Sequence, residues 1–300
     1  MRRVLSVAVV GGLVAALLSA CANPAGVDGD LVDDWKAQPE ATPFVPDAGV
    51  CHLSLPDDPY VTRDLYNPLD CATEHHYETV FVGEFTSSAA NASEPPKVPS
   101  PEQRTAFDEC NKKANEYLGA DWRGGRLNLF TYFPSKAAWE GGSRWFRCDL
   151  AEIESLDSKE IKRRSGNLKD ILKAAAPVSY GCFRAVLTNG NKDISAMNAV
   201  ACGTAHGAEY AGVWTAPESS YDDFEKNTQR AHTGCRGVVA KWAKVPNDGN
   251  IEFRTGTIIY YPSEDEWEAG NRGVQCFLWR NDQSLRRSMK GAGPTVLRIR

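Results

Sequence analysis

The sequence predicts an α+β protein built from two tandem homologous domains, each a small, mainly antiparallel sheet with one longer and one short helix. Two repeated motifs lead to this prediction. The skeleton Cys-x3-His-x2-Glu starts at Cys71 and again 131 residues later at Cys202. The run Pro-Ser-x3-Trp-Glu-x-Gly-x-Arg-x3-Cys starts at Pro134 and again 128 residues later at Pro262. A self-match over about a hundred residues indicates two domain-sized copies, because a solenoid needs at least about three short repeats.

The N-terminus predicts an exported lipoprotein. Two arginines precede an apolar run at residues 4–18, which is shorter than the about 20 residues that a transmembrane helix needs. Residues 1–20 are therefore typical of a signal peptide. The segment ends Leu18-Ser19-Ala20-Cys21, which resembles the lipobox of bacterial lipoproteins, where the signal is cut before an acylated cysteine. An ordinary secretory signal followed by an unrelated cysteine is the alternative interpretation.

Lipidation at Cys21 would hold the protein on the extracytoplasmic face of the cell membrane. Several acyl chains, palmitate among them, anchor a protein firmly, whereas one chain alone binds only marginally. Residues 21–46 are rich in Gly, Pro and Asp, and they predict a flexible stalk behind the lipidated cysteine. An irregular arm packed on the first domain is the alternative. No other long apolar run follows, so we expect membrane contact through the anchor.

The cysteines predict disulfides. There are nine, and without Cys21 the remaining eight divide equally between the two copies. An even set in an exported chain indicates disulfide bonds. Each set of four allows three pairings, and we favour the pairs that join neighbours in sequence, Cys51–Cys71, Cys110–Cys148, Cys182–Cys202 and Cys235–Cys276. Zinc is the alternative, but its ligands usually come as close Cys-x2-Cys pairs, so we expect no metal.

The first domain is expected at residues 47–154. Its predicted elements, in order, are a strand at 76–86, a helix at 100–118, a strand at 126–133, a short helix at 134–140 and a strand at 144–150. Alternating Tyr and Phe side chains indicate the first strand. The long helix has the start signal Ser100-Pro101 with Gln103 at the capping-box position, and Gly119 ends it.

The second domain, residues 177–290, is expected to repeat this order. Its predicted elements are strands at 180–187 and 209–215, a helix at 220–242, a strand at 251–261, a short helix at 262–268 and a strand at 273–279. Strands and helices without a regular βαβ alternation indicate the α+β class. Residues 155–176 are predicted to be a linker with some helix, and residues 291–300 a basic tail.

Charge and motifs exclude several functions. The formal net charge is −5, and it becomes −7 once the two arginines of the signal are removed, which gives no indication of nucleic-acid binding. The chain contains no Gly-x-Ser-x-Gly, His-Glu-x2-His or Gly-x4-Gly-Lys-Ser/Thr motif. We therefore assign no catalytic residue and expect no cofactor.

The candidate functional residues are two His–Glu pairs, His75 with Glu78 and His206 with Glu209. Such a pair could ligate a metal, or a carboxylate could orient the imidazole for acid–base work. Alternatively, the histidine closes the loop beside the disulfide and the glutamate binds backbone or an arginine.

The tryptophan of the second motif, Trp139 or Trp267, is expected to fill the core under its sheet. The arginine that follows it, Arg144 or Arg272, is expected to pair with a nearby glutamate. The candidate glutamates are Glu140, Glu268, Glu78 and Glu209.

Together, Cys-x3-His-x2-Glu and the Tyr-x-Pro/Tyr-Pro-Ser…Trp-x2-Gly…Cys run resemble the actinobacterial septum-formation domain family, and the resemblance covers both copies. The family usually has proline before the histidine, where this chain has Glu74 and Ala205. The resemblance implies an exported, membrane-attached protein linked to cell division or envelope assembly, and it implies no established reaction.

The sequence thus favours a non-enzymatic, membrane-anchored envelope lipoprotein that binds a protein or cell-wall partner, with a role in septum formation. The alternative is a metal- or His/Glu-dependent hydrolase acting on cell-wall material. A third hypothesis, a carrier of lipid or another apolar ligand, requires a closed apolar cavity.

Overall fold

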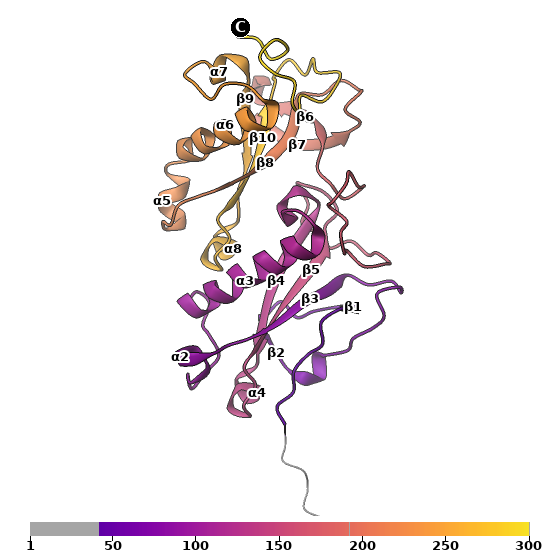
Figure 1. The fold of residues 1–300 in the computed structure, drawn as a ribbon, viewed down its shortest axis with the longest axis vertical. Helices are drawn as coiled ribbons and strands as arrows, with labels where there is room; N and C mark the ends of the chain where they lie inside the picture. The colour runs from indigo at the N-terminus through magenta and orange to yellow at the C-terminus, as the bar shows by residue number, and fades with distance from the viewer. Residues whose placement is uncertain (1–41, 192, 300) are drawn as a thin grey trace, which may run out of the picture. The chain divides into compact units, whose positions relative to one another are not determined.

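The computed structural model describes residues 42–191 and 193–299 (Figure 1). The predicted signal peptide, the lipidation site Cys21 and most of the predicted stalk lie outside these residues. Within the described part, no helix is both long and apolar enough to cross a membrane. The chain from Pro43 onward forms one compact unit that contains two sheets. We call the part that carries the first sheet the first half and the part that carries the second sheet the second half.

The first sheet has the strand order β1-β3-β5-β4-β2. Its strands are β1 (Val50–His52), β2 (Tyr60–Val61), β3 (Tyr77–Glu84), β4 (Leu127–Pro134) and β5 (Trp145–Glu152). All neighbours pair antiparallel except the short β2, which runs parallel to the end of β4. The helices of this half are η2 (Arg63–Leu65), α2 (Ser87–Ala90), α3 (Pro101–Leu118), η3 (Trp122–Gly124) and α4 (Lys136–Glu140).

The second sheet has the order β7-β6-β8-β10-β9, and all its pairs are antiparallel. Its strands are β6 (Cys182–Thr188), β7 (Asp193–Val200), β8 (Ala208–Thr215), β9 (Gly256–Tyr260) and β10 (Gly273–Trp279). Its helices are η4 (Asn189–Asn191), α5 (Tyr221–Glu225), α6 (Gln229–Ala243), α7 (Ile251–Arg254) and α8 (Glu264–Glu268). The mixed α+β class predicted from the sequence is confirmed.

Four strands of each sheet occur in the same order. The series β1-β3-β5-β4 in the first sheet corresponds to β6-β8-β10-β9 in the second, as the two repeated motifs require. The additional strands lie at opposite edges, β2 beside β4 and β7 beside β6. Sequence analysis assigned no element to β1, β2 or β7.

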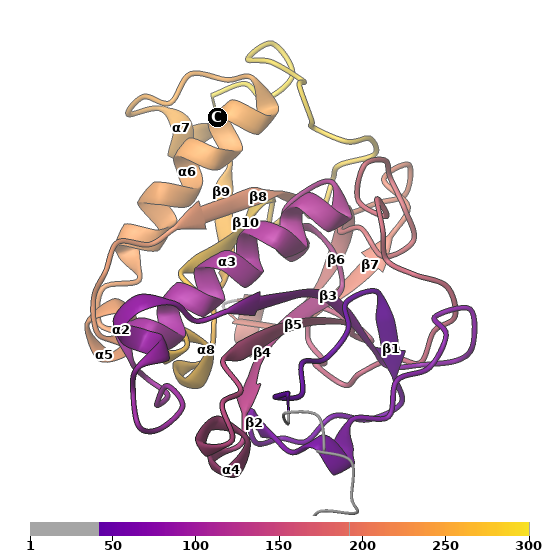
Figure 2. The ribbon, with the colours of Figure 1, turned by 60° about the horizontal axis from the view of Figure 1, so that its bottom comes forward.

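One long helix packs on each sheet and is bonded to it. Figure 2 shows α3 lying across a face of the first sheet. The predicted start of α3 is confirmed, because the Ser100 side chain accepts a hydrogen bond from the Gln103 backbone N–H. Gly119 ends the helix with a φ of 83°, a left-handed conformation that glycine adopts without strain. The apolar face of α3 meets the first core through Phe107, Cys110 and Leu118, among others.

All eight cysteines of the repeats form disulfides, paired as neighbours in sequence. Cys51–Cys71 and Cys182–Cys202 each close a loop with a sequence separation of 20 in front of a central strand. Cys110–Cys148 joins α3 to β5, and Cys235–Cys276 joins α6 to β10. The second pair in each half therefore fixes the long helix to an inner strand of its sheet.

The helix predicted at 220–242 is divided in two. α5 ends at Glu225 and α6 begins at Gln229. The Asn227 side chain donates to the Asp223 carbonyl, and the Asn227 backbone N–H turns to Phe224 three residues back. An asparagine side chain competes in this way with the regular helical bond, and the helix is interrupted there.

The strand predicted at 251–261 was wrong in its first part. Residues Ile251–Arg254 form α7, and only Gly256–Tyr260 form β9. Strand alternation would place Ile251 and Phe253 on one face, but Ile251 is buried and Phe253 is exposed. The Ile251 N–H binds the Asp248 carbonyl, so a turn leads directly into the short helix.

The segment 155–176 contains no helix, contrary to expectation. It returns to the first sheet, where the Arg164 backbone bridges His75 and the Leu168 side chain is completely buried. The predicted basic tail also packs, because the side chain of Leu297 lies in a second-half core. Both segments complete the half that precedes them, and the proposed domain boundaries stay predictions.

The two short helices α4 and α8 are capped by Ser135 and Ser263, one residue after the proline that was expected to start them. Trp139 and Trp267 are buried below them as predicted. The expected arginine–glutamate pairs at this motif were wrong. Arg144 and Arg272 each stack on the preceding tryptophan at 4.3 Å and donate to its carbonyl oxygen. The second of them binds Glu218, which sequence spacing could not indicate.

Candidate functional site

In the first half, the predicted pair lies at the start of β3. His75 is fully buried in the turn after Cys71, and its Nδ1 lies 2.8 Å from the Thr73 carbonyl oxygen. Its backbone exchanges hydrogen bonds of 2.8 and 2.9 Å with Arg164. The imidazole thus closes the loop beside the disulfide, as one of the two interpretations expected.

Glu78 fastens the segment that follows the first sheet. Its side chain is buried, Oε2 accepts from the Leu168 backbone N–H at 2.7 Å, and Oε1 accepts from the Tyr117 hydroxyl. Burial, followed by the hydrogen bond to Glu78, raises the pKa of Tyr117, so this hydroxyl remains a donor. The carboxylate therefore joins β3, α3 and the returning chain.

The second half repeats this arrangement with different partners. His206 is fully buried, its Nδ1 lies 2.8 Å from the Thr204 carbonyl, and its backbone bridges Leu285. Glu209 accepts from the backbone N–H of Met289 at 2.9 and 3.0 Å and from the Ser288 hydroxyl at 2.7 Å. The C-terminal segment is thus fastened as residues 164–168 are in the first half.

The two histidines differ at Nε2. In the second half this atom lies 3.1 Å from Glu209 Oε1, whereas His75 Nε2 is buried without a hydrogen-bond partner. A carbonyl can only accept, so Nδ1 of His206 carries a proton. The contact between Nε2 and Oε1 then needs a further proton, held by the ring or by the carboxyl group. In the first half the corresponding carboxylate oxygen, Glu78 Oε1, accepts a hydrogen bond from the Tyr117 hydroxyl instead. His75 Nε2 is therefore left without a hydrogen-bond partner.

A metal centre is incomplete at both places. Cys51, His75 and Glu78 bring potential ligand atoms within 4.8 Å of one another, as do Cys182, His206 and Glu209 in the second half. Cysteine binds metals as a thiolate, and both of these sulfurs are in disulfides. The oxidised protein therefore offers one imidazole and one engaged carboxylate at each cluster.

A buried polar network in the first half was missed by sequence analysis. The Arg147 guanidinium donates to Asp149 at 2.8 Å, the Thr79 hydroxyl donates to Asp149, and His52 Nε2 lies 3.1 Å from the Thr79 oxygen. Burial lowers the pKa of His52 to about 4, so the ring is neutral at neutral pH. All four side chains are sealed from solvent, which suits a structural role.

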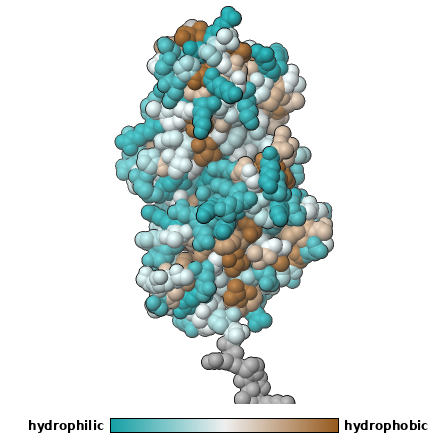
Figure 3. Space-filling view, in the orientation of Figure 1, coloured by the Kyte–Doolittle hydropathy of each residue, from teal (hydrophilic) through white to brown (hydrophobic). Residues whose placement is uncertain are grey.

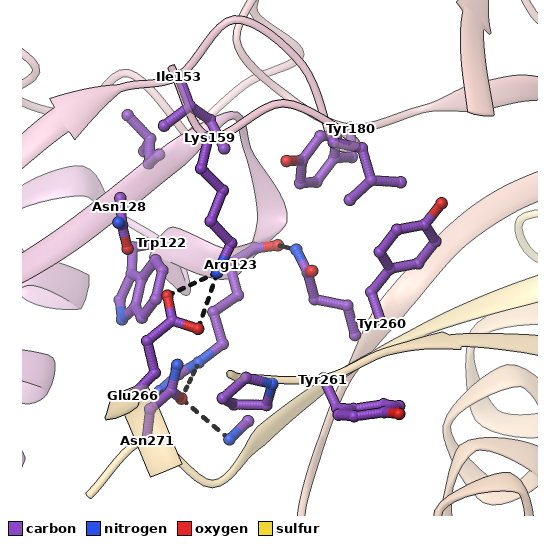
Figure 4. Close-up of a pocket in the computed structure, with 15 residues that line it drawn as sticks. Trp122, Arg123, Asn128, Ile153, Lys159, Tyr180, Tyr260, Tyr261, Glu266 and Asn271 are labelled. Carbon is purple, nitrogen blue, oxygen red and sulfur yellow. Dashed lines mark hydrogen bonds and ion pairs between the residues drawn. The ribbon is translucent and has the colours of Figure 1, made fainter. Parts of the chain in front are cut away.

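A cavity of about 70 Å³ lies where the two halves meet (Figure 4). Trp122 and Arg123 of η3 and Glu266 of α8 lie on one side, and Tyr180, Tyr260 and Tyr261 lie on the other. Burial raises the pKa of Tyr260, whose hydroxyl donates to Asp157 at 2.7 Å. Sequence analysis did not find this site, because its residues come from separate segments of the two halves, part of the second repeated motif among them, that only the fold brings together.

Arg123 holds this junction together. Its guanidinium donates to Asn271 at 2.8 and 3.0 Å, pairs with Asp121 at 3.1 Å and stacks on Trp122 at 4.4 Å. Gly273 opposes it, and a Cβ there would lie 2.1 Å from Arg123 Nε. Glycine is therefore required at this point of β10 for the halves to approach each other.

These features define a disulfide-bonded α+β protein whose paired His–Glu motifs fasten chain segments and whose open site lies between two similar sheets. The chain matches the family model described as septum formation over residues 48–276. It belongs to that family, and membership suggests a role in septum formation or cell division. No curated protein and no solved structure matches the chain.

Proposed function

We propose that this protein is a membrane-anchored envelope lipoprotein of two tandem homologous domains that binds a partner during septum formation. Family membership over most of the chain supports the cellular role. The common strand order of the two sheets and the repeated motifs support the tandem origin. The proposed partner is a protein or a cell-wall polymer on the extracytoplasmic face of the cell membrane.

The burial of both His–Glu pairs is the observation that favours binding over catalysis. A general base must reach the proton that it abstracts, and His75 and His206 have no exposed surface. Their neighbouring carboxylates are occupied by backbone and hydroxyl donors. The junction between the halves instead offers aromatic and polar side chains to a ligand.

The anchor is tested by changing Cys21 to alanine in the organism that carries the protein. We expect the variant to leave the membrane fraction, because the acyl chains would be lost. An otherwise identical strain with the natural cysteine is the control. A Cys21→Ala protein that stays in the membrane fraction would contradict the proposed anchor.

The role is tested by depleting the protein and by crosslinking it in intact cells. We expect depletion to delay or misplace septa, and crosslinking to recover a specific envelope protein or wall fragment. The anchored natural protein should restore normal septa, and the Cys21→Ala variant should restore them poorly. Normal septa after full depletion would argue against the role.

The hydrolase alternative has its own test. Purified protein is incubated with cell-wall material, and soluble fragments are measured with and without a chelator. The binding hypothesis predicts no release above that from a Glu78→Gln/Glu209→Gln variant. Release of fragments that disappears in this variant or with the chelator would support the hydrolase hypothesis over the binding hypothesis.

A further inference from the structure

A second cavity of about 250 Å³ adjoins the cavity at the junction. The two share four wall residues, Trp122, Asn128, Glu266 and Asn271. The two cavities are therefore neighbours with a common wall, and we call them together the junction groove. We take the two cavities together as one candidate site for a linear ligand.

The second cavity follows the outer edge of β4. Four consecutive residues, 128–131, line it, and both faces of a strand contribute only where a cavity lies along its edge. The short β2 pairs only with Phe133 and Pro134 and leaves this stretch of the edge uncovered by a strand. The opposite wall comes from α8 of the second half. The groove thus exists because the two halves lie together.

Aromatic rings line the groove along its length. Trp122 stands where the cavities meet, with Phe107, Phe130 and Phe133 in the second cavity and Tyr180, Tyr260 and Tyr261 in the first. Figure 4 shows Tyr180, Tyr260 and Tyr261 on the side opposite Trp122. The electron-rich face of an aromatic ring attracts the polarised C–H groups of a sugar ring.

Two polar atoms in the wall of the second cavity have no partner. Gln103 Oε1 and Thr131 Oγ1 are buried and make no hydrogen bond, and the whole Gln103 residue is only 2% exposed. Leaving a buried polar group unpaired costs about 1–3 kcal/mol. Both atoms are covered by neighbouring side chains, so a ligand hydroxyl or amide N–H would satisfy them where its entry moves those side chains.

The charges of the groove exclude an anionic ligand. Lys159 is paired with Glu266 at 2.7 Å, and Arg123 with Asp121 at 3.1 Å. The second cavity is lined by three carboxylates, those of Asp57, Asp265 and Glu266. A phosphate-bearing polymer would meet these carboxylates and would have to displace existing ion pairs. A lipid tail would strip water from them, which is unfavourable.

We propose that the junction groove binds a neutral oligosaccharide. Sugar rings present apolar faces to aromatic side chains and hydroxyl groups to amides and carboxylates, and the groove supplies both. The inference rests on the proposed binding function and names the chemical class of its ligand. In Figure 3, the face shown carries hydrophobic residues in small separate groups, which does not suggest a broad apolar docking surface.

The test titrates the full chain with four probes in a calorimeter. They are a β-1,4-linked N-acetylglucosamine hexamer, a β-1,4-linked glucose hexamer, a poly(glycerol phosphate) and an unbiased peptide mixture. We expect saturable binding of a neutral hexamer, with a change in tryptophan fluorescence because Trp122 lines both cavities. Comparison of the two hexamers distinguishes an amino-sugar polymer from a glucan.

Thr131→Val supplies the decisive variant. It removes a hydroxyl that makes no internal bond, so the melting temperature should not fall, while affinity should fall about tenfold, which is 1.4 kcal/mol. Thr131→Ser keeps the hydroxyl and should retain most of the affinity. Tyr261 lines the first cavity, away from Thr131, so Tyr261→Ser should weaken the binding of the hexamer and leave the binding of a disaccharide unaffected. Loss of affinity with Val but not Ser, at unchanged stability, identifies a ligand contact.

Three results would overturn the assignment. They are absence of saturable binding by both neutral hexamers, preference for poly(glycerol phosphate) or peptide, and equal affinity of the Val and natural proteins. If any of these occurs while crosslinking in cells still recovers an envelope partner, the saccharide assignment fails and the binding function stands. If crosslinking also recovers nothing, both fail.

Discussion

In each half the sheet face opposite the long helix buries a group of side chains, but the group is polar in the first half and largely aromatic in the second. In the first half it buries His52, Thr79, Arg147 and Asp149 as a hydrogen-bonded network. The corresponding positions of the second half, counted from the repeated cysteines and glutamates, are Phe183, Tyr210, Gln275 and Phe277. The three aromatic rings among them pack together, with centroids 5.6 Å apart for both Phe183–Phe277 and Tyr210–Phe277.

This difference teaches that one strand order tolerates either chemistry in its interior. The aromatic cluster loses water from apolar surface, which is favourable by itself. The polar network must satisfy each buried group, because a half-satisfied network is costly. It is satisfied except at Arg147 Nη2, which has no partner. We therefore expect the first half to be more sensitive to single substitutions on this face.

The largest effect is expected from Asp149→Ala. The change leaves the buried Arg147 charge without its carboxylate and should cost about 3–5 kcal/mol of unfolding free energy. Replacing both partners, as Arg147→Met/Asp149→Leu, should recover at least half of that loss, because apolar side chains avoid the buried charge. Guanidinium unfolding of the full chain, followed by circular dichroism, measures both. A double variant no more stable than the single one would show that the unpaired Arg147 charge is not the main cause of the loss in unfolding free energy.

The next comparison removes one disulfide from each half. Cys51→Ala/Cys71→Ala and Cys182→Ala/Cys202→Ala open loops of equal length, for which chain entropy predicts about 3 kcal/mol each. The second loop contains the paired strands β6 and β7, which still restrain it, whereas the first contains only β1 and the two-residue β2. We therefore expect the larger loss in the first half.

Unfolding free energies of the two double variants, with the remaining cysteines oxidised, check this prediction. A mass-spectrometric count of free thiols is the control. Equal losses would indicate that the β6–β7 hairpin does not restrain its loop once the bond is absent.

Sequence reasoning succeeded for elements whose signals are local. Ser100, Pro101 and Gly119 predicted α3 within a residue, and neighbour pairing gave the four disulfides that the structure contains. It failed where a side chain redirects the backbone, as Asn227 does between α5 and α6. β7 was missed because no counterpart in the first half indicates it.

The candidate sites can also be divided into features that local sequence predicted and features that it did not. The positions of the His–Glu pairs beside the disulfides followed from the motif, but their backbone partners come from residues 164–168 and 285–289, which have no recognisable repeat. The junction groove could not be predicted, since η3 and α8 meet only through tertiary packing of the two halves. Gly273, at the position of Trp145 in the first half, was the local sign that something approaches there.

Acidification should also distinguish the halves. His52 has an ordinary pKa near 6.5 when unfolded and about 4 when folded, so between these values the unfolded chain binds the additional proton. Stability should therefore fall as pH is lowered from 6.5 to 4, by about 3 kcal/mol over the window from this group. His52→Phe, which installs the residue found at position 183, should remove this share of the slope.

Unfolding free energies at several pH values, for the natural protein and for His52→Phe, test the assignment. Phe183→Leu in the second half is the matched control and should leave the slope unchanged. Identical slopes in the natural and His52→Phe proteins would assign the acid sensitivity to other groups.

The smallest expected effect compares the two glutamates. Glu78→Gln keeps an oxygen for the Leu168 N–H, and Tyr117 can rotate its hydroxyl, so we expect a loss of about 1 kcal/mol. Glu209→Gln can turn its amide N–H toward His206 Nε2 and keep its oxygen for Ser288 and Met289, so the loss should be no larger, about 1 kcal/mol or less.

The loosening should be local, because each carboxylate fastens one returning segment. Hydrogen exchange is expected to rise at residues 164–172 in the first variant and at 285–297 in the second, with the other segment unaffected. Exchange that rises equally in both segments would mean that the halves unfold together. The Arg123–Asn271 contact at the junction would then couple them more strongly than either glutamate holds its own segment.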